Sequence, residues 1–313
     1  MNEKNNHQKL PPVALGTWAW GTGFNGGRFI FGQKTTRDQL YDVYKEAVRN
    51  HLTLWDTAPA YGLGTCEKLL GEFTADHKDI QISTKFLPIG RRSNLRKSFE
   101  KSRVRLSRDI IDIFWIHTPY NVKKWTAELI PLLQNTGVKM VGVSNHNLEQ
   151  IKEARAILEK AGFQLNAVQN HYSLLYRPES AMAVLKYCQE ENILFFSYMI
   201  LEQGALTGTY TEDNPFPRLS RRGFAYPPKI LKQLAPLYEY ITNLATLYQV
   251  SNTAVLIAWA ISRNTIPIVG VTKEKHISSI VQGIELSLSE DTFLELEQIM
   301  EGQNIIKKGI WEQ

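Results

Sequence analysis

The sequence predicts a single (β/α)8 barrel, a TIM barrel, with its active site at the C-terminal ends of the strands. Three observations support this prediction. Eight short runs of β-branched and aromatic residues recur along the chain, amphipathic segments with apolar residues three and four apart separate them, and no linker divides the chain. This alternation favours a parallel sheet, and 313 residues suit a barrel of about 250 residues with extensions. We therefore expect one domain over residues 1–313, with residues 1–10 as a flexible polar tail.

The eight expected strands are short and apolar, and several carry a polar residue near the C-terminal end. They are Val13–Trp18, Leu52–Thr57, Ile80–Phe86, Ile110–Thr118, Val138–Asn145, Ala167–Tyr172, Ile193–Met199 and Ile266–Val271. The segments between them have helical periodicity, as in "TTRDQLYDVYKEAVRN" and "NLEQIKEARAILEKAG". In the second segment, Asn147 and Gln150 have the spacing of a capping box, and Gly162 suits the end of the helix. A doubly wound open sheet is the rival fold, but no G-x-G-x-x-G turn follows any of these strands.

Composition excludes several classes of protein. The formal net charge of +5 suits an anionic small molecule, and no run of five basic residues points to nucleic acid. The polar N-terminus lacks an apolar segment that could act as a signal peptide, and no apolar run approaches the ~20 residues of a membrane span. Two cysteines are too few for a disulfide framework or a zinc site. The expectation is a cytoplasmic, metal-free protein that binds neither nucleic acid nor membranes.

Polar residues gather at one end of the expected barrel. Asp56, Lys85, His117 and Asn145 each lie at or near the end of an apolar strand, and Tyr61 follows Asp56 in the next loop. The C-terminal ends of barrel strands carry the active site, so these side chains should lie close together.

These residue types suit proton transfer to a carbonyl oxygen. A free tyrosine titrates near pH ~10, and a lysine beside it favours the deprotonated phenol, which makes Tyr61 a better acid. Asp56 would hold Lys85 charged and oriented, and His117 could donate a second hydrogen bond to the same oxygen. Because none of these groups can supply a hydride, a cofactor must provide it.

Several motifs make a resemblance specific. "DTAPAYGLGTCEKLLG", "STK", "IHTP", "GVSNHN" and "VQNHYSLL" resemble, in order, the successive signatures of the aldo–keto reductase superfamily, and "GTWAWG" and "QGALTGTY" extend the similarity. The resemblance implies that Asp56, Tyr61, Lys85 and His117 form the catalytic tetrad. It also implies reduction of a small aldehyde or ketone by hydride transfer from NADPH, with NADH as an alternative cofactor. A monomer or weak homo-oligomer is expected.

The resemblance also assigns a cofactor site. Ser144, Asn145 and Gln169 correspond to the residues that bind the nicotinamide carboxamide, and Tyr198 to the aromatic residue that stacks on the nicotinamide. The full set of expected cofactor contacts is Thr17, Trp18, Asp56, Ser144, Asn145, Gln169, Tyr198, Leu201, Gln203, Gly204, Gly270, Thr272 and Lys273.

The chain departs from the family pattern at several positions. Cys66 replaces the usual serine before Glu67, and His276 and Ile280 replace an arginine and an asparagine that often contact the adenosine part of the cofactor. Thr272 and Lys273 are then the remaining phosphate contacts.

Substrate contacts are expected from aromatic residues that follow two of the strands. Trp18 and Trp20 lie at the exit of the first strand and Tyr120 follows the fourth, so all three are expected to line the substrate pocket. Arg218, Arg221 and Arg222 lie in the long segment 208–228 after the seventh strand, and they are either solvated or clamp the cofactor.

Other interpretations remain open at this point. Asp56 could cap a turn, and Lys85 could be a structural ion-pair partner. A Schiff-base lyase would use Lys85 as its nucleophile, although a carboxylate partner keeps a lysine protonated. A non-catalytic, NADPH-binding regulatory barrel is the third alternative, since the same superfamily also supplies that role.

Overall fold

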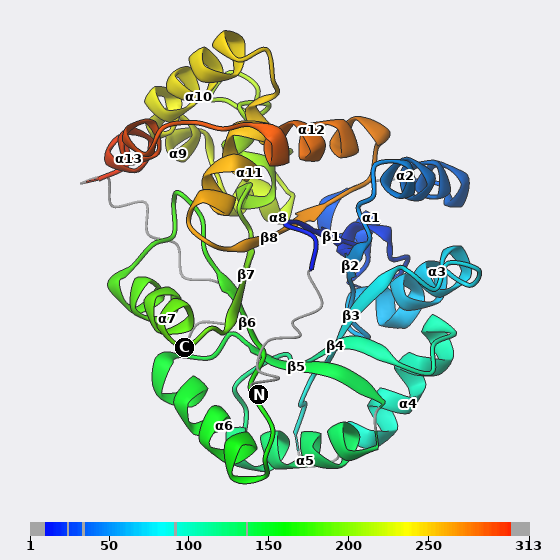
Figure 1. Ribbon diagram of the computed structural model, residues 1–313. Helices are drawn as coiled ribbons and strands as arrows, with labels where there is room; N and C mark the ends of the chain where they lie inside the picture. The colour runs from blue at the N-terminus through cyan, green and yellow to red at the C-terminus, as the bar shows by residue number, and fades with distance from the viewer. Residues whose placement is uncertain (1–9, 24, 33–34, 91–92, 136, 302–313) are drawn as a thin grey trace.

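Eight parallel strands close into a barrel in the computed structural model, which describes residues 10–23, 25–32, 35–90, 93–135 and 137–301. The strands pair in sequence order, and β1 closes the barrel against β8 with Gly16 opposite Gly270. Most of the helices form a layer around the strands (Figure 1). This confirms the predicted (β/α)8 fold. The expected tail falls almost wholly on residues 1–9, which lie outside the described residues.

All eight predicted strands are present, each somewhat shorter than expected. They are β1 Ala14–Gly16, β2 Leu54–Asp56, β3 Gln81–Phe86, β4 Ile111–Ile116, β5 Val138–Ser144, β6 Ala167–His171, β7 Leu194–Tyr198 and β8 Ile266–Gly270. The difference is one to three residues in each strand.

The helices are α1 Gly27–Phe31, α2 Arg37–Arg49, α3 Thr65–Phe73, α4 Leu95–Leu106, α5 Val122–Gln134, α6 Leu148–Lys160, α7 Glu179–Glu190, α8 Arg221–Ala225, α9 Pro228–Gln233, α10 Ala235–Leu247, α11 Asn252–Ser262, α12 Glu274–Glu285 and α13 Glu290–Gln298. Three short 3-10 turns, η1 Trp18–Trp20, η2 Tyr61–Gly64 and η3 Glu202–Thr207, follow β1, β2 and β7. The capping box of Asn147 and Gln150 opens α6 as predicted, and Gly162 follows its end with a positive φ.

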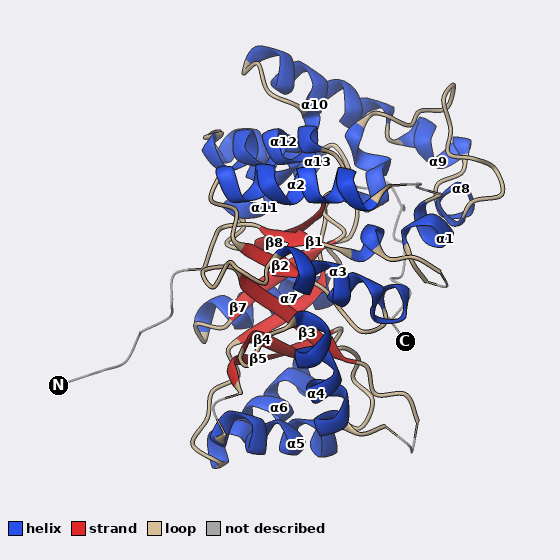
Figure 2. Ribbon diagram, turned by 90° about the vertical axis from the view of Figure 1, so that its right-hand side faces the viewer, coloured by secondary structure: helices blue, strands red, loops and turns tan. Residues whose placement is uncertain are grey.

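The segment 208–228 is more ordered than its composition suggests. It contains α8, whose first turn is capped by the Ser220 side chain, which accepts a hydrogen bond from the backbone N–H of Gly223. In Figure 2, α8 and α1 lie together at one end of the strands. The segment therefore borders the barrel mouth in a defined conformation.

Two apolar layers hold the barrel together. One fills its interior and includes Ile113, Trp115 and Phe196, and the other lies between strands and helices. Gly142 of β5 is required by this packing, because a Cβ there would lie 2.4 Å from the Trp115 ring. Alternating side chains along each strand point to one layer or the other, which decides which polar residues face the barrel axis.

No single helix in the described residues has the length and apolar content needed to cross a membrane. Only α10 and α11 taken together reach that composition, and the two helices are bent by 97° relative to each other.

Candidate active site

Neighbouring strands bring the four predicted catalytic residues together. Asp56 is the last residue of β2, Lys85 lies in β3, His117 follows β4, and Tyr61 begins η2. Asp56, Lys85 and His117 are buried, and Tyr61 is partly exposed. The arrangement arises because parallel strands place their C-terminal ends at the same edge of the sheet.

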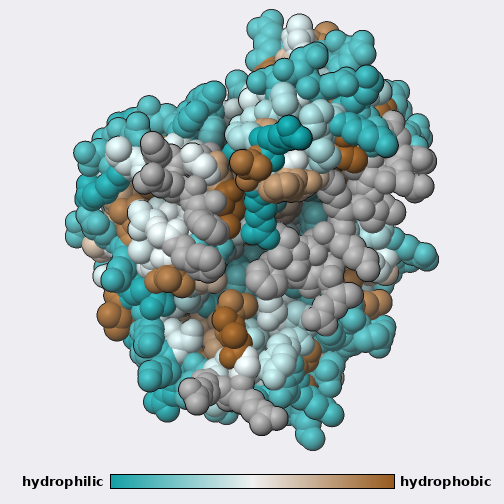
Figure 3. Space-filling view, turned by 180° about the vertical axis from the view of Figure 1, so that it is seen from behind, coloured by the Kyte–Doolittle hydropathy of each residue, from teal (hydrophilic) through white to brown (hydrophobic). Residues whose placement is uncertain are grey.

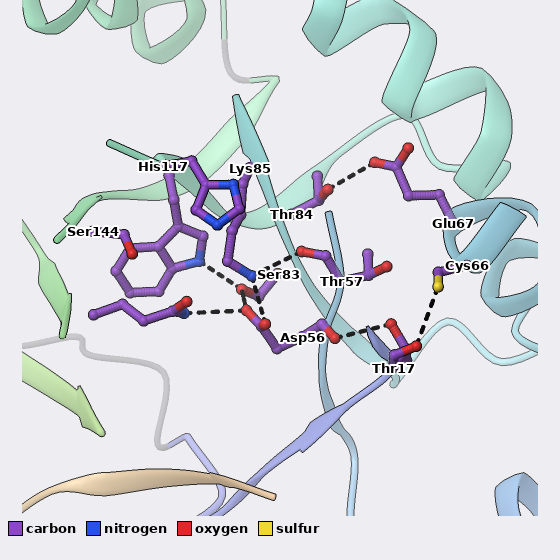
Figure 4. Close-up of polar contacts among 12 residues, drawn as sticks. Thr17, Asp56, Thr57, Cys66, Glu67, Ser83, Thr84, Lys85, His117 and Ser144 are labelled. Atoms are coloured by element: carbon purple, nitrogen blue, oxygen red, sulfur yellow. Dashed lines mark hydrogen bonds and ion pairs between the residues drawn. The ribbon is translucent and has the colours of Figure 1, made fainter. Parts of the chain in front are cut away.

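Asp56 and Lys85 form a buried ion pair. The Lys85 ammonium donates to Asp56 Oδ2 at 2.5 Å and to the backbone oxygen of Thr57 at 2.9 Å (Figure 4). Asp56 Oδ1 accepts from the Ser83 hydroxyl at 2.8 Å and from the Gln169 amide at 3.2 Å. Burying two charges is costly unless both are paired and hydrogen-bonded, and here both conditions are met.

Tyr61 lies beside this ion pair. The Lys85 Nζ atom is 5.2 Å from the centre of the Tyr61 ring, and the His117 ring centre is 6.3 Å away. Trp18 stacks on the phenol ring with centres 5.5 Å apart. The turn that presents Tyr61 needs glycine at position 62, where φ is 55° and an added Cβ would come within 2.8 Å of Gly21. The phenol is therefore held in a defined position at the barrel mouth.

Burial controls the protonation states in the site. It raises the pKa of Tyr61 well above the ordinary value, with Asp56 adding to the effect, so the phenol carries its proton at neutral pH. This corrects the expectation that Lys85 dominates this pKa, because the loss of hydration outweighs the nearby cation. Burial also lowers the pKa of Lys85, against the opposing effect of Asp56. The pKa of His117 falls to about 3 through burial and the Lys85 charge, so its imidazole is neutral.

A cavity of about 1100 Å³ runs across the barrel mouth from these residues to α12. Of the expected site residues, it is lined by Trp18, Asp56, Tyr61, His117, Ser144, Asn145, Gln169, Tyr198, Leu201, Gln203, Gly204, Gly270, Thr272 and Lys273. Figure 3 shows the molecule from behind the view of Figure 1, where hydrophobic patches gather around the middle of a mostly hydrophilic face. Lys85 is not among the residues that line the cavity, but it donates to Asp56, which lines it.

The chain is similar to known proteins over most of its length. The aldo/keto reductase family model matches residues 12–301. The chain belongs to the aldo/keto reductase family of oxidoreductases. This confirms the resemblance that the motifs indicated.

Two relatives and two solved structures illustrate the range of the similarity. The chloroplastic pyridoxal reductase of Arabidopsis thaliana is 28% identical over 92% of this chain and 82% of its own length. The aldo-keto reductase yakc [NADP(+)] of Schizosaccharomyces pombe is 26% identical over 92% of this chain and 90% of its own length. The fold also resembles that of the glycerol dehydrogenase of Gluconobacter oxydans, with a TM-score of 0.80 and 24% identity. The match covers 96% of this chain and 94% of that protein. An aldo/keto reductase from Klebsiella pneumoniae in complex with NADP and acetate has a TM-score of 0.71 and 20% identity, and the match covers 93% of this chain and 91% of that protein.

Two expected substrate residues lie elsewhere. Trp20 is buried, donates from its indole N–H to the backbone oxygen of Val271 at 2.6 Å, and packs against Trp55. The η1 turn directs Trp18 to the cavity and Trp20 into the core, which the two-residue spacing alone did not reveal. Tyr120 is 51% exposed and lies outside the residues that line the cavity.

Thr17 also lies outside the cavity wall. Its hydroxyl donates to the backbone oxygen of Asp56 at 3.1 Å, and its own backbone oxygen accepts from the Cys66 thiol at 3.1 Å. Burial raises the pKa of that thiol to about 12, so Cys66 stays protonated and acts as a small buried donor. Thr17 and Cys66 thus support the backbone of Asp56, and neither is among the residues that line the cavity.

The predicted nicotinamide contacts form a connected group. Asn145, at a φ of 63°, donates to the backbone oxygen of His117 at 2.8 Å and accepts from the Tyr198 hydroxyl at 2.6 Å. Ser144 and Gln169 line the same part of the cavity. This group joins the ends of β4, β5 and β7.

The residues at the far end of the cavity fit a dinucleotide phosphate. Thr272 Oγ1 and Gln203 Oε1 are buried and have no hydrogen-bond partner within the described residues, and a Cβ on Gly270 would meet open space. Arg221, Arg222, Lys273 and Lys275 line this end, whereas Arg218 does not. Elsewhere in the described chain, no group of three His, Cys, Asp or Glu residues could hold a metal ion.

Sequence reasoning missed several cavity residues. Lys275, Ser279 and Gln282 of α12 line the far end, and Asn25 and Leu87 line the end near Tyr61. The spacing of the α12 residues by four and three positions is a helical signal that could have found them. Ile280, by contrast, is fully buried, so the position of the family asparagine faces the core in this chain.

Proposed function

We propose that this protein reduces a small aldehyde or ketone to the alcohol with NADPH, and that Tyr61 is the general acid. The observation that carries the proposal is the arrangement at the barrel mouth. A protonated phenol and a neutral imidazole border one cavity, with a buried lysine–aspartate pair directly behind the phenol. The nicotinamide, when bound, supplies the hydride.

Each residue of the tetrad has a distinct role. Tyr61 donates its proton to the developing alkoxide, and Lys85 stabilises the phenolate that remains through its charge. Asp56 keeps Lys85 oriented through the 2.5 Å contact. His117 stays neutral above pH ~4 and donates a hydrogen bond to the substrate oxygen.

NADPH is proposed as the cofactor because four cationic side chains line the far end of the cavity. The name of the S. pombe relative and the complex of the K. pneumoniae protein both point to NADP. Tyr198 would support the nicotinamide ring, Ser144, Asn145 and Gln169 would bind its carboxamide, and Thr272, Lys273 and Gly270 would hold the phosphates. NADH remains the alternative.

The substrate end suits a neutral, planar carbonyl compound. Trp18, Phe31 and Leu87 form its apolar wall, and Trp18 lies parallel to Tyr61. An aromatic aldehyde would pack against the indole. The pyridoxal reductase relative acts on a compound of this kind by its name, so pyridoxal belongs in any substrate screen.

A screen of carbonyl compounds that follows NADPH oxidation tests the proposal. Turnover that requires Tyr61 would support it. Tight NADPH binding without turnover on any carbonyl would instead favour the regulatory barrel. A Schiff-base lyase is disfavoured because Lys85 is fully buried and already donates to Asp56 and Thr57. Borohydride trapping of a carbonyl compound on Lys85 would revive it.

A further inference from the structure

A second buried carboxylate lies beside the cofactor cavity and takes no part in the proposed reaction. Glu202 follows β7, is 2% exposed, and has a φ of 45°, a left-handed conformation that side chains other than glycine rarely adopt. Both the burial of a charge and the backbone conformation are unfavourable, so the surrounding structure must stabilise this residue.

Three donors satisfy the Glu202 carboxylate. His171 Nε2 donates to Oε1 at 2.8 Å, the Ser173 hydroxyl donates to the same oxygen at 2.5 Å, and the Tyr226 hydroxyl donates to Oε2. Burial acts to raise the pKa of Glu202, but these partners outweigh it and hold that pKa below its ordinary value. Glu202 is therefore an anion with both oxygens in use.

Through Oε1, Glu202 holds His171, which stacks on Tyr198, the residue proposed to stack on the nicotinamide. The His171 ring stacks against two tyrosine rings. Its centre lies 5.5 Å from that of Tyr198, with 16° between the ring planes, and 4.2 Å from that of Tyr176, with 6° between the planes. Tyr198 borders the cavity and His171 does not, so His171 backs the buried face of the Tyr198 ring. The contact with Glu202 fixes the plane of the imidazole and, through it, the position of that ring.

The Oε2 side holds the segment that borders the cationic end of the cavity. Tyr226 directly follows α8, and Arg222 within α8 donates to the backbone oxygens of Phe31 and Gln203. Arg221 and Arg222 both line the cavity. The Tyr226 hydroxyl therefore anchors the segment whose arginines face the proposed phosphate site.

We propose that Glu202 is a positioning residue for the dinucleotide, because a single carboxylate holds both the backing of Tyr198 and the anchor of α8. The inference rests on the proposed function, since it takes the dinucleotide to bind in this cavity. Loss of the carboxylate should leave the tetrad in place, because none of the hydrogen bonds described above joins Glu202 to Asp56, Tyr61, Lys85 or His117.

Tyr226→Phe and Glu202→Gln test the inference, with Glu297→Gln as the matched control. The Glu297 carboxylate also has three side-chain partners, since it accepts hydrogen bonds from Trp259 and Arg263 and forms an ion pair with Arg177, but it lies outside the cavity wall. The measurements are NADPH dissociation constants by protein fluorescence, NADPH release rates by stopped flow, Tm, and kcat and KM for the carbonyl compound.

Tyr226→Phe should raise the NADPH dissociation constant about tenfold, as expected for losing one hydrogen bond to a charged group, mainly through faster release. The KM for the carbonyl should change less than twofold. Glu202→Gln should weaken NADPH binding at least as much, and adding Tyr226→Phe to it should have little further effect, because both changes break the same link. Glu297→Gln should lower Tm and leave NADPH binding unchanged.

Equal dissociation constants in wild type and Tyr226→Phe would overturn the inference, as would fully additive effects of the two substitutions. If Glu202→Gln fails to fold, the Tyr226→Phe comparison decides alone. Absence of NADPH binding in the wild-type protein would instead refute the proposed function. The two failures are therefore distinguishable.

Discussion

Two ion pairs, each with a buried carboxylate, lie on the two faces of β3 and face different parts of the molecule. Asp56 and Lys85 are 2.5 Å apart, with side chains 4% and 0% exposed. Glu67 and Arg105 are also 2.5 Å apart, with side chains 0% and 19% exposed. Asp56 of the first pair lines the cavity, and the second pair joins α3 to α4 in the helical layer.

The two pairs are separated because successive side chains of β3 point to opposite faces of the sheet. Lys85 points to the barrel axis, whereas its neighbour Thr84 points outward and donates to Glu67 at 2.7 Å (Figure 4). Two ion pairs of similar length, each with a buried carboxylate, thus lie in two different environments. An inward pair can act on a bound substrate, and an outward pair can only hold helices to the barrel. A buried ion pair by itself does not identify an active site.

The largest expected effects come from breaking each pair in turn. Glu67→Gln leaves Arg105 without its charge partner and should lower the free energy of unfolding by about 3 kcal/mol, with normal turnover per folded molecule. Asp56→Asn should also destabilise, but it should lower turnover as well, because Lys85 loses the group that holds its charge. Urea denaturation and steady-state assays on both variants make the comparison. Equal turnover losses would show that the two pairs do not differ as described.

Tyr61→Phe should have the next largest effect. It removes one oxygen and little volume, so the free energy of unfolding should change by about 1 kcal/mol or less. Turnover should fall by about 10²-fold or more, the scale for losing a general acid. Tyr120→Phe makes the same change on a 51% exposed side chain and should alter neither quantity. A stable and fully active Tyr61→Phe protein would refute the assignment.

Acid should destabilise the barrel through His117. Its pKa is about 3 in the folded chain and about 6.5 when unfolded, so the unfolded state binds more protons between these values. The free energy of unfolding therefore falls as the pH drops through this window. At pH 5 His117 should lower it by about 2 kcal/mol relative to neutral pH. His146 and His276, each with a pKa lowered to about 4, act in the same direction.

Urea denaturation at pH 7 and pH 5 isolates the contribution of His117. His117→Asn should lose less stability than wild type between the two pH values, whereas His51→Asn, at an exposed position, should lose as much. Identical losses in wild type and His117→Asn would show that His117 accepts a proton in the folded protein.

Lys273→Ala tests the exposed end of the cavity. Lys273 is exposed and Lys275 lies nearby, so its contact with a 2′-phosphate should be worth about 1.4 kcal/mol. The NADPH dissociation constant should rise about tenfold, and that for NADH should stay the same. Lys229→Ala, outside the cavity, serves as the control. An unchanged ratio of the two constants would move the role to Lys275, His276 or the arginines of α8.

Tyr198→Ala should have the smallest effect. Aromatic stacking contributes about 0.5–1.5 kcal/mol beyond area burial, so NADPH binding should weaken several-fold to about tenfold. The fold should be kept, because Tyr198 borders the cavity and is not part of the apolar core. Tyr248→Ala, at a 44% exposed position, should leave binding unchanged. Equal dissociation constants would contradict the stacking role.

The sequence by itself determined the barrel and the positions along it of the four residues predicted to be catalytic. Strand and helix periods are local properties, and a polar residue after an apolar run marks a strand end without knowledge of the rest of the chain. The family motifs fall on these same strand ends, so Asp56, Tyr61, Lys85 and His117 could be named at once.

Only the tertiary structure decided which side chains meet the cavity. Trp18 and Trp20 differ by two positions in one turn, yet one lines the cavity and the other packs against Trp55. Glu202 and Tyr226 are 24 residues apart, and their contact depends on how the segment after β7 folds back. Such contacts join distant segments through packing and burial, which no local pattern of residues encodes.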